Sequence, residues 1–316
     1  ISSTILGYGS HGTVVYEGVL NPENRKVAVK RLLKQFFPSA RNEIGVLIEL
    51  EQCGAHVVRY YAMEEDTEFI YVALELCAGT LADFVDQGLP PALPLSLSTN
   101  ASLAKHAKTF THQPIPAATI QALRDVLLGL SELHKQGIVH RDLKPHNILV
   151  SEKRTMVRSS SSSGSSPYEM VTHMLKLGDV GLALRLDDDR SSFTGKEAHG
   201  AGSVGWRAPE VLQNGRLTKA VDVFSAGCVM YYTLTGGCHP FGSMVYERDG
   251  LIMSGKCSLN DLHDPEARHL VGLMLEHDAD QRISVDEALL HPFFWSDHTK
   301  LSFLCDVSDR LVLLDT

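Results

Sequence analysis

The octapeptide HRDLKPHN at residues 140–147 limits what this chain can fold into and do more than any other stretch. It places a carboxylate, Asp142, two residues before an ammonium group, Lys144, and five residues before an amide, Asn147. Such an aspartate can accept the proton of a substrate hydroxyl, the lysine can neutralise a transferred phosphoryl group, and the asparagine can hold Mg²⁺. The alternative is a polar loop after an amphipathic helix. Eight consecutive matches by chance are very improbable, so we interpret the stretch as a catalytic loop with a structural His140.

A glycine-rich stretch, GYGSHGTVV, lies near the start of the chain. Gly7, Gly9, Gly12 and Val14 give it the spacing G-x-G-x-x-G-x-V. Glycines let the backbone approach phosphate oxygens closely and adopt φ values closed to other residues. Tight hairpins also use glycine, so the pattern alone leaves both interpretations open. The flanking segments have strand patterns, unlike the strand-to-helix turn of a dinucleotide fold, and this favours a triphosphate-binding loop.

Lys30 closes an apolar segment, VAVK. In most proteins such a lysine is simply an exposed strand end. Downstream of a glycine-rich loop, however, a cation is needed for the α- and β-phosphates of a nucleotide. Its expected anchor is a helix glutamate. Glu43 is the best candidate because it lies near the start of the predicted helix, whereas Glu49 and Glu51 lie further along it.

A third motif, LGDVGLA, follows a predicted short strand. Asp179 lies on a glycine-flanked turn, where a carboxylate can bridge Mg²⁺ to the β- and γ-phosphates. Val180 replaces the phenylalanine of the D-F-G pattern. Metal binding should survive this change. The buried side chain at position 180, which distinguishes active from inactive states in the D-F-G pattern, should pack less well. Truncating a buried Phe costs on the order of several kcal/mol unless neighbours refill the space.

Two further motifs predict structural roles. Glu210, which ends WRAPE, is expected to pair with a buried arginine, and Arg282 in DADQRIS is the natural partner. Asp222 begins the apolar stretch DVFSAGCVMYYTLTG, where it could cap a helix or steady the catalytic loop.

The segment before WRAPE contains three hydroxyl residues, Ser191, Ser192 and Thr194. They are either solvated loop residues or phosphorylation sites. Arg141 precedes the catalytic aspartate, and an arginine there can pair with a phosphate from this segment. Both interpretations remain open at this point.

Composition excludes several classes of protein. The 316 residues carry a formal charge of −9, which offers no basic stripe for nucleic acid. The six cysteines include no CxxC pair, which is typical of reduced thiols. No apolar run approaches the roughly 20 residues of a spanning helix. The chain starts without Met and directly in a motif, so we expect it to be part of a longer protein.

The order of patterns predicts an α+β architecture with two lobes. Strand patterns and one helix fill a small N-terminal lobe, 1–77, and helical patterns dominate a large C-terminal lobe, 78–294. The N-terminal helix is predicted over Ser39–Glu51, with Ile44, Leu47, Ile48 and Leu50 at nearly helical spacing. In the large lobe, an apolar stripe of Ile120, Leu123, Leu127, Leu130 and Leu133 predicts a helix with Gly137 as its C-terminal cap, and Ser284 with Glu287 predicts a capping box. Two tracts rich in Ser, Thr or Pro, 88–116 and 157–170, are predicted to be disordered insertions, the second between two short strands.

With these motifs in order from Gly7 to Arg282, the chain resembles the eukaryotic protein kinases over nearly its full length. Lys144 after Asp142, and Ser203 in GSVGWRAPE, resemble the serine/threonine branch. The likeness extends to LELCAGTLADFV, RLTKAVDVFSAGCVMYYTLTGGCHPFG, HRDLKPHNILV and HPFFWSDHTKLSFLCDVSDRL. These stretches are similar to the inositol-requiring transmembrane kinase/endoribonucleases, the unfolded-protein sensors of the endoplasmic reticulum.

The resemblance implies a bilobal kinase fold that binds ATP or ADP with Mg²⁺. Lys30, Glu43, Asp142 and Lys144 would be catalytic, and Asn147 and Asp179 would hold the metal. Leu74 would be the gatekeeper, Glu75 to Cys77 the hinge that meets adenine, and Leu149 the floor of the adenine pocket. The remaining nucleotide-binding positions would be Leu6, Gly7, Gly9, Gly12, Val14 and Ala28.

The resemblance also implies a partner and a location. The kinase would pair with a second copy of itself, phosphorylate it in trans and so control an adjoining endoribonuclease. Residues 295–316 would begin that nuclease domain, and Phe303, Leu304 and Val307 are spaced to pack one helix face against its neighbour. RNA would bind the nuclease and not this segment. A membrane anchor outside this sequence would hold the kinase at the cytosolic face of the endoplasmic reticulum.

Two other hypotheses stay open. One is a nucleotide-gated dimerisation scaffold with little phosphoryl transfer, against which the intact set Lys30, Asp142, Asn147 and Asp179 argues, because a scaffold needs no base. The other is an unrelated serine/threonine kinase with a similar tail.

Overall fold

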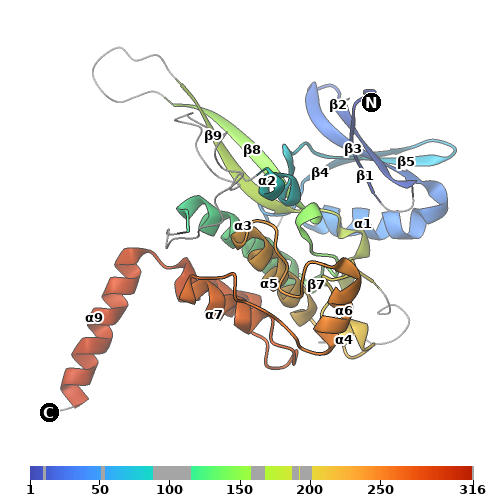
Figure 1. Ribbon diagram of the computed structural model, residues 1–316. Coiled ribbons are helices and arrows are strands. Elements are labelled where there is room, and N and C mark those ends of the chain that lie inside the picture. Colours follow the sequence, from blue (N-terminus) through green and yellow to red (C-terminus); the bar gives the residue numbers. More distant parts are fainter. Residues whose placement is uncertain are drawn as a thin grey trace, which may run out of the picture.

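The computed structural model describes residues 1–9, 12–50, 54–87, 115–157, 168–186, 192 and 201–314. Its first part is rich in strands and its second part is mostly helical, and the two parts form the two lobes visible in Figure 1. This is the α+β, bilobal architecture that the sequence predicts.

A five-stranded antiparallel sheet, in the order β1-β2-β3-β5-β4, forms the N-lobe. Its strands are β1 (Ile5–Tyr8), β2 (Val14–Leu20), β3 (Arg25–Leu33), β4 (Tyr60–Glu65) and β5 (Phe69–Glu75). Strand β3 shows how the alternation works. Val27 and Val29 pack with Ala73 on one face, whereas Leu32 packs with Ile44 on the other. Because side chains alternate between faces, Lys30 lies on the same face as Leu32, toward the helix.

That helix is α1 (Phe37–Leu50), which follows a short 3₁₀ turn, η2 (Lys34–Phe36). It begins two residues before the predicted start at Ser39. Ile44 and Leu47 are buried, as their helical spacing predicts, while Ile48 is 50% exposed. Glu43 lies on the buried side, with only 3% of its surface exposed. The helix therefore presents a carboxylate to β3.

Two long helices form the centre of the C-lobe. In α3 (Ala117–Lys135), the predicted apolar stripe is buried and includes Leu123, Leu127 and Leu130. Gly137 follows this helix with φ +70°, which suits the C-terminal cap that the sequence predicts. Helix α5 (Ala220–Leu234) is buried from Val221 to Tyr231, as its continuous apolar sequence predicts.

Shorter elements surround these two helices. The capping box predicted at Ser284 and Glu287 is confirmed, because each side chain bonds to the other residue's backbone N–H. The shorter elements are α2 (Leu81–Asp86), α4 (Pro209–Leu212), α6 (Val245–Met253), α7 (Pro265–Met274), α8 (Val285–Leu289), η6 (Pro292–Phe294), and the paired strands β7 (Ile138–Val139) and β10 (Leu184–Arg185).

A hairpin of two ten-residue strands, β8 (Ile148–Val157) and β9 (Tyr168–Leu177), joins a small sheet with β6 (Gly79–Thr80). The strands are longer than the short pair that the sequence predicts. Val157 pairs with Tyr168, so positions 157 and 168–170 belong to the hairpin and not to an insertion. Residues 158–167, like 88–114 of the other predicted insertion, lie outside the described residues.

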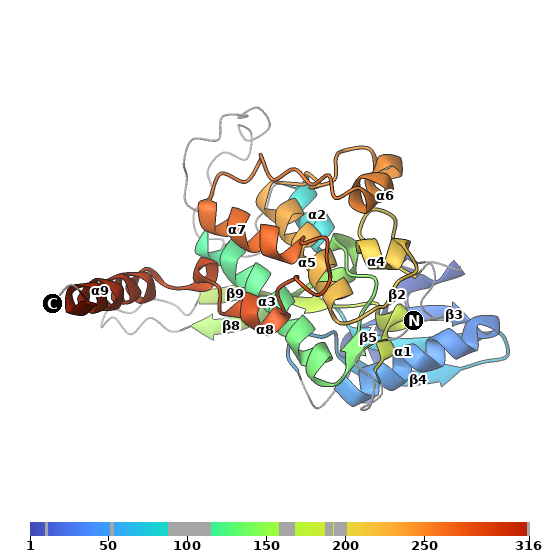
Figure 2. The same cartoon turned by 90° about the horizontal axis from the view of Figure 1, so that it is seen from below.

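The last helix, α9 (Asp297–Leu314), extends away from the C-lobe in both views (Figures 1 and 2). Phe303 contacts the ring of Trp295, and Lys300 pairs with Glu266 of α7. Leu304 remains 62% exposed. The apolar face that the sequence predicts on this helix therefore exists but is largely uncovered. Within the described ranges, no helix is both long and apolar enough to cross a membrane.

Candidate active site

The catalytic loop runs from β7 to β8 and is fixed from below by α5. The Asp222 carboxylate, fully buried, accepts hydrogen bonds from the backbone N–H of His140 and of Arg141, both at 2.8 Å, and contacts His134 Nε2 at 2.9 Å. Burial alone would raise the pKa of Asp222, but these hydrogen bonds and the nearby histidines lower it below its usual range. Arg141 is held at φ +67°, a strained conformation for a residue with a Cβ. Asp222 therefore steadies the loop.

Within the loop, Asp142 lies at the centre of a contact set. Asn147 Nδ2 donates to the backbone carbonyl of Asp142 at 2.8 Å and to its Oδ2 at 2.9 Å. Lys144 Nζ lies 3.3 Å from Oδ2 and donates to the Ser203 hydroxyl at 2.5 Å. The other oxygen, Oδ1, is buried and has no hydrogen-bond partner among the described residues. An unpaired buried carboxylate oxygen is costly, so this atom is placed to accept a proton from a bound hydroxyl.

Asp179 lies two residues after the end of β9, in the left-handed conformation at φ +54° and ψ +60°. The preceding turn is fixed to the catalytic loop. His140 Nε2 bonds to the carbonyl of Gly178 at 2.9 Å, and the N–H of Gly178 donates to the carbonyl of Asn147 at 2.8 Å. These bonds bring Asn147 and Asp179, 32 residues apart in sequence, to one place. His140 is fully buried and acts structurally.

Lys30 joins the two lobes. Its ammonium nitrogen lies 2.7 and 2.9 Å from the two carboxylate oxygens of Glu43 and 2.8 Å from Oδ1 of Asp179. Burial alone would lower the pKa of Lys30, but the two carboxylates outweigh it and raise the pKa above its ordinary value. The same ammonium group lowers the pKa of Asp179 against the opposing effect of burial. Glu43, and not Glu49, is thus the partner of Lys30, while Glu51 lies outside the described residues. Glu49 pairs instead with Arg185.

Val180 is fully buried in the main apolar core. It begins the turn η5 (Val180–Leu182), which packs against α1. A smaller side chain than phenylalanine is therefore still enclosed between the lobes, and Glu43 keeps its contact with Lys30.

The predicted nucleotide-binding residues belong mostly to strands of the N-lobe sheet and to β8. Ala28 of β3 is directly opposite Leu74 of β5, and Leu149 of β8 packs so closely on Gly178 that a Cβ there would lie 3.0 Å from its Cδ1. Gly12 has φ +75°, which only glycine adopts readily. Leu6 and Gly7 lie in β1, Val14 begins β2, and Gly9 N–H bonds to the carbonyl of Thr13 at 2.9 Å. Positions 10 and 11 of the loop lie outside the described residues.

The predicted hinge begins at Glu75, for which the resemblance implies a contact with adenine. In the structure the Glu75 side chain points to the C-lobe and pairs with Lys176 at 2.7 Å. Cys77 is half-buried, and burial raises the pKa of its thiol to about 12. The sequence contains no local signal for the Glu75–Lys176 pair, because the two residues lie 101 positions apart.

Asn147 and Asp179, the predicted Mg²⁺ ligands, each have a side-chain oxygen that can face a metal ion. Asn147 Nδ2 faces Asp142, which leaves Oδ1 as an oxygen donor, and the side chain of Asp179 is 47% exposed. Amide and carboxylate oxygens suit Mg²⁺, which usually takes one or two protein ligands plus phosphate oxygens. The residues present therefore fit the metal.

The end of the activation segment is held by a buried ion pair. Arg282 donates to both oxygens of Glu210, at 2.7 and 3.1 Å, and its side chain has no exposed surface. This is the pairing that the sequence predicts. Of the three hydroxyl residues proposed as phosphorylation sites, Ser191 and Thr194 lie outside the described residues, and Ser192 is described alone.

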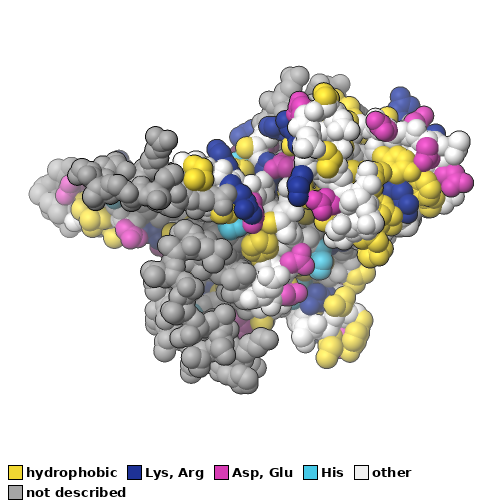
Figure 3. Space-filling model, turned by 90° about the horizontal axis from the view of Figure 1, so that it is seen from above, with side chains coloured by type: hydrophobic (Ala, Val, Ile, Leu, Met, Phe, Trp, Pro, Cys, Tyr) yellow, Lys and Arg dark blue, Asp and Glu magenta, His cyan; other side chains and the backbone are white. Residues whose placement is uncertain are grey.

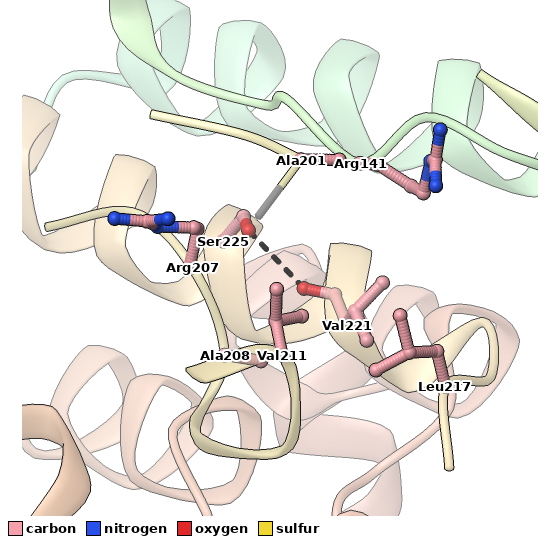
Figure 4. A pocket seen from close by; sticks show the side chains of 8 residues that line it. All are labelled: Arg141, Ala201, Arg207, Ala208, Val211, Leu217, Val221 and Ser225. Atoms are coloured by element: carbon pink, nitrogen blue, oxygen red, sulfur yellow. Dashed lines mark hydrogen bonds between the residues drawn. The ribbon is translucent and has the colours of Figure 1, made fainter. Parts of the chain in front are cut away.

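A small pocket lies between this segment and α5 (Figure 4). Ser225 donates to the carbonyls of Trp206 and Val221 at its wall. The guanidinium groups of Arg141 and Arg207 point away from its centre in Figure 4, and the residues between them are small or apolar. The pocket is lined by Arg141, Ala201, Arg207, Ala208, Val211, Leu217, Val221 and Ser225. It packs the segment and contributes no reacting group to the catalytic loop.

Comparison with known proteins places this site in a family. Residues 2–294 match the protein kinase domain. The chain is 40% identical over 333 residues to serine/threonine-protein kinase/endoribonuclease IRE1a of Arabidopsis thaliana, covering 99% of this chain and 37% of the relative. It is 39% identical over 313 residues to the protein named IRE1 of Oryza sativa subsp. japonica, with 98% and 32% covered.

A third relative is named a sensor for unfolded proteins in the ER, from Schizosaccharomyces pombe, with 35% identity over 329 residues and 97% and 28% covered. The chain thus spans about a third of the length of these curated relatives. The residues of the chain that match the protein kinase domain include every predicted catalytic position. The chain therefore belongs to the protein kinase domain family, and the relatives it resembles along almost all of its length are kinase/endoribonucleases of the IRE1 type.

Proposed function

We propose that this protein kinase domain transfers the γ-phosphoryl group of ATP to serine or threonine hydroxyls, including those of a second copy of itself. The observation that carries this proposal is the contact set around Asp142, with one carboxylate oxygen unpaired and Lys144 bridging to Ser203. The relatives are named serine/threonine-protein kinases, which agrees with this substrate class.

The geometry supports a specific division of roles. Asp142 Oδ1 accepts the proton of the attacking substrate hydroxyl. The hydroxyl oxygen forms a bond to the γ-phosphorus, and the bond from the γ-phosphorus to the bridging β–γ oxygen breaks, which releases ADP. Lys144 neutralises charge on the transferred group, and Lys30 binds the α- and β-phosphates. Bound Mg²⁺, held by Asn147 and Asp179, would screen the charge of the phosphates.

We further propose that activation-segment phosphorylation controls an endoribonuclease at the cytosolic face of the endoplasmic reticulum, with the membrane anchor outside this sequence. The names of the relatives support this link, since they join kinase to endoribonuclease, and one is a sensor for unfolded proteins in the ER. We assign RNA binding to the nuclease. On the face drawn in Figure 3, acidic and basic side chains are interspersed and do not gather into a basic patch.

Phosphoryl transfer from ATP with Mg²⁺ tests the proposal. Asp142→Asn preserves the shape of the side chain and removes the base. We expect it to lower the rate by about 10²- to 10⁴-fold, as is typical for loss of a general base. Mapping of phosphate on the parent should find it at Ser191, Ser192 or Thr194. A tagged Asp142→Asn copy mixed with the parent should gain phosphate if transfer occurs in trans.

The alternative, a nucleotide-gated dimerisation scaffold, predicts a different result. In that case the parent and Asp142→Asn would show the same background signal, and nucleotide would promote dimer formation in both. Equal signals would therefore reject the kinase mechanism proposed here.

A further inference from the structure

Glu75, the last residue of β5, is tied to the C-lobe through both of its carboxylate oxygens. Oε1 accepts a hydrogen bond from the Ser151 hydroxyl at 2.6 Å, and Oε2 accepts one from Lys176 Nζ at 2.7 Å. The N–H of Arg59 adds a longer contact at 3.4 Å. The side chains of Glu75 and Lys176 are only 17% and 13% exposed. Removing one partner of such a pair leaves the other charge uncompensated, so the pair holds its strands together.

The strands on the C-lobe side carry the two proposed metal ligands. Strand β8 begins at Ile148, directly after Asn147, and β9 ends at Leu177, two residues before Asp179. Ile148 and Leu177 face each other in the hairpin, and the bond from Gly178 N–H to the carbonyl of Asn147 closes its base. The hairpin base lies at the junction of the lobes (Figure 1). It is one hydrogen-bonded unit that presents both ligands.

From these two observations we infer that Glu75, Lys176 and Ser151 are positioning residues that fix the distance between the adenine-binding hinge and the Mg²⁺-binding residues. The inference rests on the proposed function, because it needs a nucleotide that spans the two. Ser151 belongs to β8 and Lys176 to β9, so Glu75 accepts a hydrogen bond from each strand of the hairpin.

The consequence concerns how nucleotide and metal bind together. Adenine meets the hinge, and the phosphates meet Asn147 and Asp179 through Mg²⁺. Without Mg²⁺, ADP can bind through the hinge alone, whereas with Mg²⁺ its phosphates must also reach Asn147 and Asp179 at a set distance from the hinge. Without the contacts of Glu75 with Lys176 and Ser151, part of the binding free energy that Mg²⁺ adds would be used to fix the distance between the hinge and the hairpin. The Mg²⁺-induced gain in ADP affinity would therefore fall.

The test measures ADP affinity by calorimetry with and without Mg²⁺, and takes the ratio of the two dissociation constants. Lys176→Met keeps the apolar stem and removes the charge. We expect it to reduce the Mg²⁺-induced gain in ADP affinity about fivefold or more, the lower range for coupled sites. Lys176→Arg should retain the gain. Lys34→Met, which removes an exposed pair with Glu65 at 3.6 Å, is the matched control and should leave it unchanged.

A merely structural role predicts another outcome. Lys176→Met would then weaken ADP by the same factor with and without Mg²⁺, which would overturn the inference, as would a parent whose ADP affinity does not respond to Mg²⁺. If Lys176→Met fails to fold, Glu75→Gln with Lys176→Met removes both charges together and takes its place. A parent that binds no ADP would overturn the proposed function as well. Retained coupling in the variants would overturn only the inference.

Discussion

Replacement of Lys30 by methionine should make the stability of this protein fall more steeply with rising pH than that of the parent. Lys30 lies between two carboxylates, with Glu43 at 2.7 Å and Asp179 at 2.8 Å. The side chain of Glu43 is only 4% exposed, so solvent cannot replace the lost ammonium group. Removing one partner of a buried ion pair typically costs about 3–5 kcal/mol in free energy of unfolding.

The sign of the pH dependence follows from Glu43. Burial already raises the pKa of Glu43 above the ordinary 4.5, with Lys30 acting to lower it. Without Lys30 the pKa rises further, because Asp179 remains nearby. The folded state then binds a proton that the unfolded state has released, so stability is greatest below pH 4.5 and is lost as pH rises. The loss is about 1.36 kcal/mol per pH unit until the folded pKa is reached.

Urea unfolding of Lys30→Met at pH 5.5 and 7.5 measures this loss, which should reach about 1–2.7 kcal/mol over the two units. The double variant Lys30→Met with Glu43→Gln has no buried carboxylate at position 43 and serves as the control. Its stability should change with pH less steeply than that of the single variant. Equal pH dependence in the single and double variants would refute the reasoning, because Glu43 would then have moved into solvent.

Three further predictions concern buried groups elsewhere. Arg282→Met should lower the free energy of unfolding by about 3–5 kcal/mol, because Glu210 is left unpaired; a loss below about 1 kcal/mol in urea titration would contradict the ion pair seen here. Cys77, with a thiol pKa raised to about 12 by burial, should react with iodoacetamide at pH 8 much more slowly than the exposed Cys305, as followed by mass spectrometry; equal rates would contradict its burial. Burial, with Arg248 nearby, lowers the pKa of His239 to about 3, so the unfolded state alone takes up this proton as pH falls below 6.5. The loss of stability on acidification should be shallower by about 1.36 kcal/mol per pH unit in His239→Gln, and an unchanged slope would count against a neutral buried histidine.

The sequence predicts those parts of the site in which chemistry and local spacing coincide. Lys30 needs a helix carboxylate, and the position of Glu43 near the start of α1 is enough to select it over Glu49. The pairing of Glu210 with Arg282 was predicted from the motifs WRAPE and DADQRIS, and it forms because an arginine whose side chain has no exposed surface needs a carboxylate partner. The α+β architecture follows from strand and helix periodicity, because each period buries one face.

Contacts between distant elements could not be predicted in the same way. His56 bonds to Glu132 at 2.8 Å across 76 positions, and no periodic pattern connects a loop before β4 with the last turn of α3. The length of the β8–β9 hairpin was also missed. Val157 and Tyr168 flank a serine-rich tract whose composition suggests no strand, yet they pair because the register continues from the hairpin base.

The substitution of valine for phenylalanine at position 180 changes how the two lobes are held together. Val180 is fully buried, so the position still joins η5 to the core, but each buried CH₂ that a phenylalanine would add is worth about 0.8 kcal/mol. With less apolar contact at this point, more of the free energy that holds η5 near α1 must come from the contacts of Lys30 with Glu43 and Asp179. A Cβ on Gly181 would lie 3.3 Å from Glu43 Oε2, so the turn and the helix already meet closely at the ion pair. Position 180 therefore makes this kinase more dependent on its charged contacts than one with a larger buried side chain.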